Sequence, residues 1–283
     1  NHPEALHYLG VIAYQVGRYD RAVDYIGKAI ELNPTIADFH NNIAQAYRAQ
    51  GKLEKAVAHY REALALKPGR AEVFSNLGVA LKAQGKLEEA LVQYRQALAL
   101  KPAYAEAHFN LGNVLREQGK LEEAIASYRE ALALKPAYVE AYNNLGNALR
   151  DQGKLEEAVA QYRQAIALKP DCVEAHINLG NALKEQGKQE ETVAHFQHAI
   201  ALRPTLAEAH NSLGNALKDQ GKLEEALVCY RRALALKPAY AEGFFNVGNL
   251  LREQGKLEEA AEAYRQALAI APKDGVRILL ATM

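Results

Sequence analysis

Histidines are the side chains in this sequence best suited to binding a metal or transferring a proton, and several recur at a fixed spacing. At one recurring position histidine alternates with Phe and Tyr, which indicates that the side chain there fills space in the core, because Phe and Tyr could not replace a histidine that binds a metal. His195 and His198 lie three residues apart without a Cys or carboxylate set around them, so we expect them at the surface and predict no metal site. The recurring place holds histidine in four copies and an aromatic residue in three: His40, His108, His176 and His210, against Phe74, Tyr142 and Phe244.

The acidic pairs and the two cysteines predict no catalytic centre either. Pairs such as Glu156–Glu157 recur along the chain at places where we expect a helix to begin. Carboxylates there interact favourably with the positive end of the helix dipole. This indicates a structural role and not general acid–base catalysis. Cys172 and Cys229 make no disulfide framework and are typical of a reducing cytoplasm. With no Gly-rich phosphate loop and no nucleophile–base set, we predict no enzymatic activity, no cofactor and a cytoplasmic location.

A strict period of 34 residues organises the chain, because eight glycines (Gly17 to Gly255) and eight prolines (Pro34 to Pro272) recur at that spacing. Such a period is typical of a solenoid built from stacked units. We number each repeat so that its glycine is position 15 and its proline is position 32. A single repeat domain is then expected over residues 1–274, and the start of a truncated C-terminal helix over 275–283. The eight repeats are 3–36, 37–70, 71–104, 105–138, 139–172, 173–206, 207–240 and 241–274.

The sequence of each repeat predicts two helices, which we call helix A and helix B. Helix A is expected from position 1 to about position 14 and ends at a "QG" pair, where glycine adopts the positive φ of a helix stop. Helix B opens with "KLEEA", continues through "YRQALAL" and ends before the proline. The sequence therefore predicts an all-α fold of eight helix–turn–helix repeats.

The charge and hydropathy of the chain disfavour two classes of partner. The 283 residues contain 34 basic and 34 acidic side chains, without the basic excess of a nucleic-acid binder. The apolar runs are short, and the start "NHPEALHYLG" does not resemble a signal peptide, so we expect neither a membrane span nor secretion. We predict that the partners are proteins or extended peptides, and not nucleic acid or membrane.

The repeats resemble the tetratricopeptide repeat family over nearly the whole chain. This resemblance implies a right-handed α-solenoid superhelix in which the free side of helix A lines the inner, concave wall. Position 4, where the family has a large aromatic residue, is often histidine here. The residues of repeat 5 that carry the resemblance, with counterparts in the other repeats, are Leu145, Gly146, Ala158, Tyr162, Ala165 and Pro170.

Asparagines mark one side of helix A. Positions 4, 7, 8 and 11 form an apolar stripe, and positions 2, 6, 9 and 13 lie opposite it at about 100° per residue. A solvated helix face would normally carry Lys, Glu or Gln, which favour helix more than asparagine does. We therefore predict that a peptide-binding groove is lined by Asn42, Asn76, Asn110, Asn144, Asn178 and Asn246 at position 6, and by Asn113, Asn147, Asn181, Asn215 and Asn249 at position 9.

The chemistry of the carboxamide suits a polypeptide ligand, because it both donates and accepts hydrogen bonds and can pair with any peptide unit. Packed helices lie about 8–10 Å apart and an extended chain advances about 3.3 Å per residue, so one asparagine per repeat would meet about every third peptide unit. The alternative is that these amides only link neighbouring repeats. Acids at positions 2 and 13, with a single base at position 12, also predict a mildly negative groove wall.

The asparagine series and the stretch "NLGNALKEQGK" resemble the superhelical domain of O-GlcNAc transferase and its bacterial relatives. The resemblance implies recognition of acceptor polypeptides in front of a glycosyltransferase domain that this chain lacks. Two alternatives remain open: a free-standing adaptor for multiprotein assembly, and an engineered, consensus-like scaffold. We also expect end-to-end self-association, because uncapped terminal repeats expose apolar faces.

Overall fold

The computed structural model of the chain describes residues 2–271, which form sixteen α-helices and no strand. This confirms the predicted all-α fold of helix pairs, an α-solenoid. The expected C-terminal helix over 275–283 lies outside the described residues. The helices are α1 (Pro3–Gln15), α2 (Tyr19–Leu32), α3 (Ala37–Ala49), α4 (Leu53–Leu66), α5 (Ala71–Ala83), α6 (Leu87–Leu100), α7 (Ala105–Glu117), α8 (Leu121–Leu134), α9 (Val139–Asp151), α10 (Leu155–Leu168), α11 (Val173–Glu185), α12 (Gln189–Leu202), α13 (Ala207–Asp219), α14 (Leu223–Leu236), α15 (Ala241–Glu253) and α16 (Leu257–Ile270).

The odd-numbered helices are helix A of each repeat and the even-numbered helices are helix B. Helix A ends at position 13, one residue earlier than expected, because the residue at position 14 (glutamine in repeats 2 to 8, Val16 in repeat 1) is the C-cap and the glycine leaves the helix. After α7, for example, Gln118 is the C-cap and Gly119 has a φ of 74°. A side chain with a Cβ is strained at that φ, so the "QG" pair determines where the chain turns into helix B.

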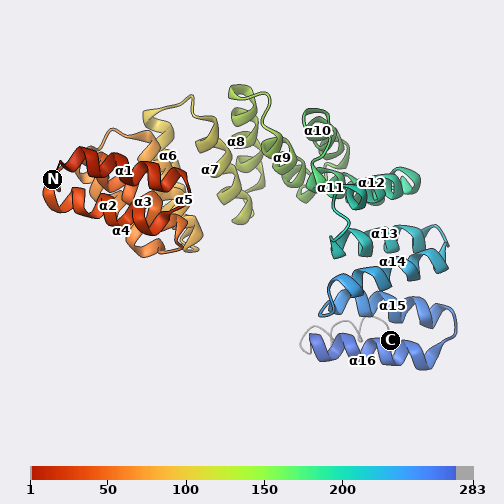
Figure 1. The fold of residues 1–283 in the computed structure, drawn as a ribbon. Coiled ribbons are helices and arrows are strands. Elements are labelled where there is room, and N and C mark those ends of the chain that lie inside the picture. The colour runs from red at the N-terminus through yellow and green to blue at the C-terminus, as the bar shows by residue number, and fades with distance from the viewer. Residues whose placement is uncertain (1, 272–283) are drawn as a thin grey trace. The chain divides into compact units, whose positions relative to one another are not determined.

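Contacts divide the described residues into two compact parts, which meet at residues 148 and 149, inside α9. In each part the helices follow one another in chain order, as Figure 1 shows. In the N-terminal part each helix from α1 to α7 packs against the next one, and α1, α3, α5 and α7 also contact one another in succession. In the C-terminal part each helix from α10 to α15 packs against the next one, and α13 also contacts α15.

The core of a repeat is built around the aromatic residue at position 24 of helix B. Tyr128 of α8 is fully buried. Its ring lies on Gly112 of α7, where an added Cβ would come within 2.7 Å of the ring atom Cε1. The same close approach joins Gly214 to Tyr230 and Gly248 to Tyr264. Glycine at position 8 therefore lets the aromatic ring reach across helix A, toward position 9.

Repeat 1 exposes a side of helix A that is covered in later repeats. Leu9 and Ile12 of α1 are 48% and 56% exposed, whereas Ile43 and Ala46, at the same positions of α3, are 2% and 0% exposed. The difference arises because α3 packs against α2 of the preceding repeat. End-to-end association between copies would cover this apolar side of α1, and that association stays a prediction.

Candidate functional site

The eleven predicted asparagines lie on helix A of their repeats, and each is partly buried, so that part of every side chain is accessible. We call this set the asparagine row. The helices that carry it are α3 (Asn42), α5 (Asn76), α7 (Asn110 and Asn113), α9 (Asn144 and Asn147), α11 (Asn178 and Asn181), α13 (Asn215) and α15 (Asn246 and Asn249).

The position-9 asparagines are oriented by the tyrosine at position 24 of the same repeat. Tyr128 Oη donates a hydrogen bond to Asn113 Oδ1 at 2.8 Å. The same bond, also at 2.8 Å, joins Tyr230 to Asn215 and Tyr264 to Asn249. Because an aromatic hydroxyl donates to the amide oxygen in each case, the amide nitrogen of the asparagine keeps its two N–H groups for other partners.

A second bond links neighbouring repeats through the row. Asn144 Nδ2 donates to Asn113 Oδ1 at 2.8 Å. Asn113 Oδ1 thus accepts from both Tyr128 and Asn144, which uses its two lone pairs. The groups remaining at this junction are the two N–H groups of Asn113 and the second N–H of Asn144, which can only donate, and Asn144 Oδ1, which can only accept. Donors and an acceptor on neighbouring repeats match the C=O and N–H of a peptide unit.

The row changes its pattern between repeats 7 and 8, where position 6 of repeat 7 is serine. Asn246 Nδ2 donates to Asn211 Oδ1 at 2.9 Å, and Asn211 Nδ2 donates to Glu242 Oε1 at 3.0 Å. Asn211 occupies position 5 and is 2% exposed. Asn211 was not among the predicted site residues, although an asparagine directly beside Ser212, where the series is interrupted, is a signal that could have indicated it.

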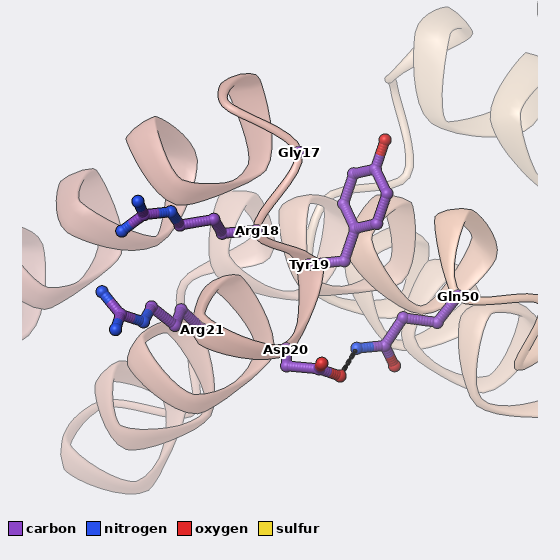
Figure 2. Close-up of a pocket in the computed structure, with 6 residues that line it drawn as sticks. All are labelled: Gly17, Arg18, Tyr19, Asp20, Arg21 and Gln50. Atoms are coloured by element: carbon purple, nitrogen blue, oxygen red, sulfur yellow. Dashed lines mark hydrogen bonds between the residues drawn. The ribbon is translucent and has the colours of Figure 1, made fainter.

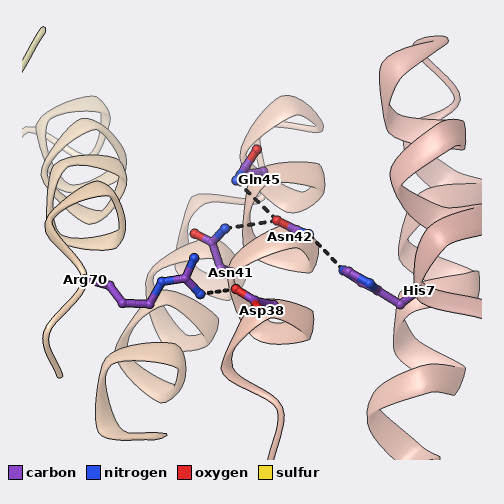
Figure 3. A network of polar contacts seen from close by, with 6 residues as sticks. All are labelled: His7, Asp38, Asn41, Asn42, Gln45 and Arg70. Atoms are coloured by element: carbon purple, nitrogen blue, oxygen red, sulfur yellow. Dashed lines mark hydrogen bonds and ion pairs between the residues drawn. The ribbon is translucent and has the colours of Figure 1, made fainter. Parts of the chain in front are cut away.

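Asn42 begins the row and has three polar partners, shown in Figure 3. Asn42 Nδ2 lies 2.8 Å from His7 Nε2 of repeat 1, and Asn42 Oδ1 accepts from Asn41 Nδ2 at 2.9 Å and from Gln45 Nε2 at 3.5 Å. An amide nitrogen only donates, so His7 Nε2 is the acceptor and the imidazole is neutral. Burial lowers the pKa of His7, which favours the same neutral form.

Ion pairs neutralise the acids on this side of helix A, so the prediction of a mildly negative wall is wrong in these repeats. Bases at position 12 pair with acids at position 13 of the next repeat: Lys82–Glu117 at 2.6 Å, Arg150–Glu185 at 3.9 Å, Lys184–Asp219 at 3.1 Å and Lys218–Glu253 at 3.5 Å. Acids at position 2 pair with a base at position 31 of their own repeat: Glu72–Lys101 at 3.2 Å, Glu106–Lys135 at 3.3 Å, Glu174–Arg203 at 3.1 Å and Glu208–Lys237 at 2.7 Å. Sequence counting missed the position-31 bases because they lie at the end of helix B.

A further bond joins repeats at the turn between helices A and B. Gln50 Nε2, at position 14 of repeat 2, donates to Asp20 Oδ1 of repeat 1 at 2.7 Å, as Figure 2 shows. Equivalent bonds join Gln118 to Glu88 at 2.9 Å and Gln254 to Glu224 at 3.0 Å. The open pocket around this contact in Figure 2 is the turn itself, so we assign these residues a role in repeat packing.

The histidines contact one another across the helices of a repeat. His176 Nδ1 lies 3.0 Å from His195 Nδ1, and His176 Nε2 lies 3.0 Å from the carbonyl oxygen of Pro170. His40 and His59 repeat this arrangement at 3.1 Å. The expectation that His195 lies at the surface is therefore wrong, because it is half-buried against His176; His198 is exposed, with its ring centroid 4.3 Å from that of His176.

Burial explains the electrostatics of these histidine pairs. A carbonyl oxygen only accepts, so His176 Nε2 donates to Pro170 and, in the neutral form, His176 Nδ1 accepts from His195. Desolvation lowers the pKa of His176 and of His195, and the neighbouring imidazole lowers that of His195 further. Desolvation and the charge of His40 lower the pKa of His59 in the same way.

Within residues 2–271 no group of three or more His, Cys, Asp or Glu side chains is arranged to hold a metal ion. In the same region no helix has the length and apolar character needed to cross a bilayer. The thiols of Cys172 and Cys229 are partly buried and not bonded to each other, and burial raises the pKa of Cys229. A raised pKa favours the less reactive thiol form.

Family profiles together match residues 3–274. A profile described as "TPR repeat" matches residues 44–85, 80–115, 112–150, 146–187, 180–221 and 214–251. Two profiles described as "Tetratricopeptide repeat" match residues 3–36 and 241–274, and residues 25–58. The chain belongs to the tetratricopeptide repeat family. These repeats form a non-catalytic fold that binds protein partners.

Solved structures with tetratricopeptide-type folds superimpose on this repeat protein. The structure of the APC/C hetero-tetramer Cut9-Hcn1 matches with a TM-score of 0.68 and 18% sequence identity. The match covers 94% of this chain and 52% of the matched Cut9-Hcn1 chain, so this chain spans about half the length of that relative. Pseudomonas aeruginosa pilF has a TM-score of 0.64 at 22% identity, covering 75% and 97%. MamA has a TM-score of 0.55 at 26% identity, covering 59% and 97%. No curated protein matches the sequence significantly.

Proposed function

We propose that this tetratricopeptide repeat protein binds an extended polypeptide along the asparagine row, through the peptide backbone of the ligand. The observation that carries the proposal is the orientation of Asn113. Its Oδ1 accepts from Tyr128 and Asn144, so its N–H groups point away from those bonds and are the groups that a ligand carbonyl would meet. Asn144 Oδ1 is the matching acceptor for a ligand N–H.

The row combines two roles, ligand binding and the linking of neighbouring repeats. At the junction of repeats 4 and 5, Asn113 Oδ1 and one N–H of Asn144 stabilise the contact between the repeats, and the other N–H groups and Asn144 Oδ1 serve the ligand. A side chain held by two internal bonds loses little conformational freedom when it binds, so each contact with the ligand contributes more of its free energy to affinity. A backbone-directed row of this kind tolerates many ligand sequences.

The finer proposal is that the polypeptide is a glycosylation acceptor, as in the superhelical domains of O-GlcNAc transferase-like proteins. The support is the sequence resemblance of the asparagine series and of "NLGNALKEQGK". A free-standing adaptor and a consensus-like scaffold would use the same row for other ligands. The reading frame beyond Met283 distinguishes these functions, because a glycosyltransferase domain there favours acceptor recognition and a stop codon favours the adaptor.

The test of backbone binding removes the side-chain N–H donors at position 9 and keeps the Oδ1 atoms that accept hydrogen bonds from the tyrosines. In the triple variant Asn113→Asp, Asn215→Asp, Asn249→Asp, each Oδ1 still accepts from its tyrosine, but the N–H groups are lost. The probe is an uncharged peptide selected on the wild-type chain from a displayed random library. At about 0.5–1.5 kcal/mol for each lost bond, we expect the affinity to fall at least about tenfold while the melting temperature is retained.

Asn33→Asp is the matched control, because Asn33 Oδ1 accepts from Thr35 and the residue lies outside the row. This control should bind the peptide as the wild type does. Unchanged affinity in the triple variant would show that the position-9 amides serve only the packing of the repeats, and the proposal would then be wrong.

A further inference from the structure

A small pocket opens beside the first asparagine of the row, at the junction of repeats 1 and 2. Its volume is about 160 Å³, and it is lined by Val11, Tyr14, Gln15, Ile26, Asn42 and Gln45. None of these residues carries a charge. The volume is well below the ~300–1,000 Å³ of pockets that take a drug-sized molecule, so the pocket has room for a single side chain.

The pocket exists because repeat 1 departs from the other repeats at position 24. Ile26 stands where the other repeats have Tyr or Phe, and Val11 stands at position 9. Ile26 packs on Gly10, since a Cβ there would come within 2.3 Å of Ile26 Cγ1, just as Tyr128 packs on Gly112. Isoleucine is shorter than tyrosine, so the space that the outer half of the phenol ring fills in repeat 4 is empty in repeat 1.

The rim of the pocket is polar and fixed. Asn42 Nδ2 bonds to His7 Nε2 at 2.8 Å, and Asn42 Oδ1 accepts from Asn41 and Gln45, so the amide is held from both ends, as Figure 3 shows. One N–H of Asn42 Nδ2 is left to meet a carbonyl outside these bonds. A ligand carbonyl bound there would place its neighbouring side chain at the mouth of the pocket.

We propose that this pocket binds one aliphatic side chain of the polypeptide held along the asparagine row, and so sets the register of a ligand that the row alone would hold in many registers. This inference rests on the proposed backbone binding. Apolar surface leaves water on entering the pocket, while a charged side chain would lose hydration without gaining a counter-charge from the lining residues. The preferred residues are therefore Leu, Ile, Val or Met.

The experiment fills the pocket with side chains that the chain itself uses elsewhere. In the double variant Val11→Asn, Ile26→Tyr, the junction acquires the Tyr–Asn pair of repeat 4, with Gly10 already present to receive the ring. Random 12-residue peptides are selected by display on the wild-type chain and on the variant. We expect an aliphatic residue at one fixed position in the wild-type selection only. For a selected peptide with Leu at that position, replacement by Ala should weaken wild-type binding about tenfold and variant binding hardly at all.

Val79→Asn is the matched control, because it adds the same asparagine at position 9 of repeat 3, where Tyr94 already fills the junction. This control should keep the aliphatic preference. Peptides enriched on the wild type without a fixed aliphatic position, or a preference that survives in the filled variant, would overturn the inference and leave the proposed function standing. No enrichment of any peptide on the wild type would overturn both.

Discussion

Tyr128 of helix B and Asn113 of helix A are joined by a hydrogen bond of 2.8 Å, and this bond connects the core of a repeat to its candidate binding surface. The phenol ring is fully buried against Gly112, while its hydroxyl orients an amide that is partly exposed. The packing of the core therefore decides which atoms of Asn113 would face the proposed ligand.

Removing only the hydroxyl should cost much less stability than removing the ring. We expect Tyr128→Phe to lower the free energy of unfolding by about 0.5–1.5 kcal/mol, and Tyr128→Ala by about 3–5 kcal/mol, measured by urea unfolding. Repeat 6 carries Phe196 at the same position, fully buried, which indicates that phenylalanine fits this space. Equal losses for the two variants would mean that the hydroxyl, and not the ring, holds the junction together.

A methyl group at Gly112 should conflict with the same ring. An added Cβ would lie 2.7 Å from Tyr128 Cε1, so we expect Gly112→Ala to destabilise the protein by about 1–3 kcal/mol despite the higher helix propensity of alanine. Gly27→Ala is the control within a helix, because nothing lies within 4 Å of its Cβ, and it should stabilise the protein by up to about 1 kcal/mol. Thermal unfolding of the two variants should move the midpoint in opposite directions.

The histidine pairs predict a loss of stability in mild acid. A histidine whose pKa is lower in the folded protein than in the unfolded chain contributes stability above the unfolded pKa, and this contribution is lost as the pH falls below about 6.5. Burial lowers the pKa of His7, His59, His176 and His195 in the folded protein. The urea midpoint should therefore decrease between about pH 7 and pH 5.

Substitution of one member of each pair tests this assignment. His59→Gln with His195→Gln introduces a residue that occurs at the same position as Gln93 and Gln161. Because two of the four histidines with lowered pKa are removed, the pH slope of stability should fall by about half. An unchanged slope in the double variant would assign the acid sensitivity to other groups.

The ion pairs along helix A predict that binding depends weakly on salt. Acids at positions 2 and 13 are paired with bases, so the surface beside the asparagine row has little net charge for a ligand to meet. Two peptides that differ only in Lys or Glu residues should bind within about threefold of each other at both ~50 mM and ~500 mM salt. A strong preference for the lysine peptide that disappears in salt would restore the negative wall that the sequence alone suggested.

The helix pairs, the packed histidines at position 4 and the face that carries the asparagines can be predicted from the sequence alone. The period of 34 residues predicts the helix pairs, because glycine at position 15 and proline at position 32 restrict the local backbone in every repeat. The alternation of histidine with Phe and Tyr at position 4 predicted a packed imidazole, and His40 and His176 are buried whereas His108 and His210 are half-buried. The row of partly accessible asparagines follows from helical periodicity alone. These features depend on residues close together in the chain.

The partners of the asparagines were decided by the tertiary structure. Asn144 bonds to Asn113 across 31 residues, whereas Asn246 bonds to Asn211 across 35, although Asn144 and Asn246 occupy the same position of their repeats. His195 meets His176, and position-31 bases meet position-2 acids, only once helix B folds against helix A. Such contacts depend on the rotation and spacing of neighbouring helices. Side-chain packing sets that geometry, through contacts such as the ring of Tyr128 on Gly112, and no local pattern encodes it.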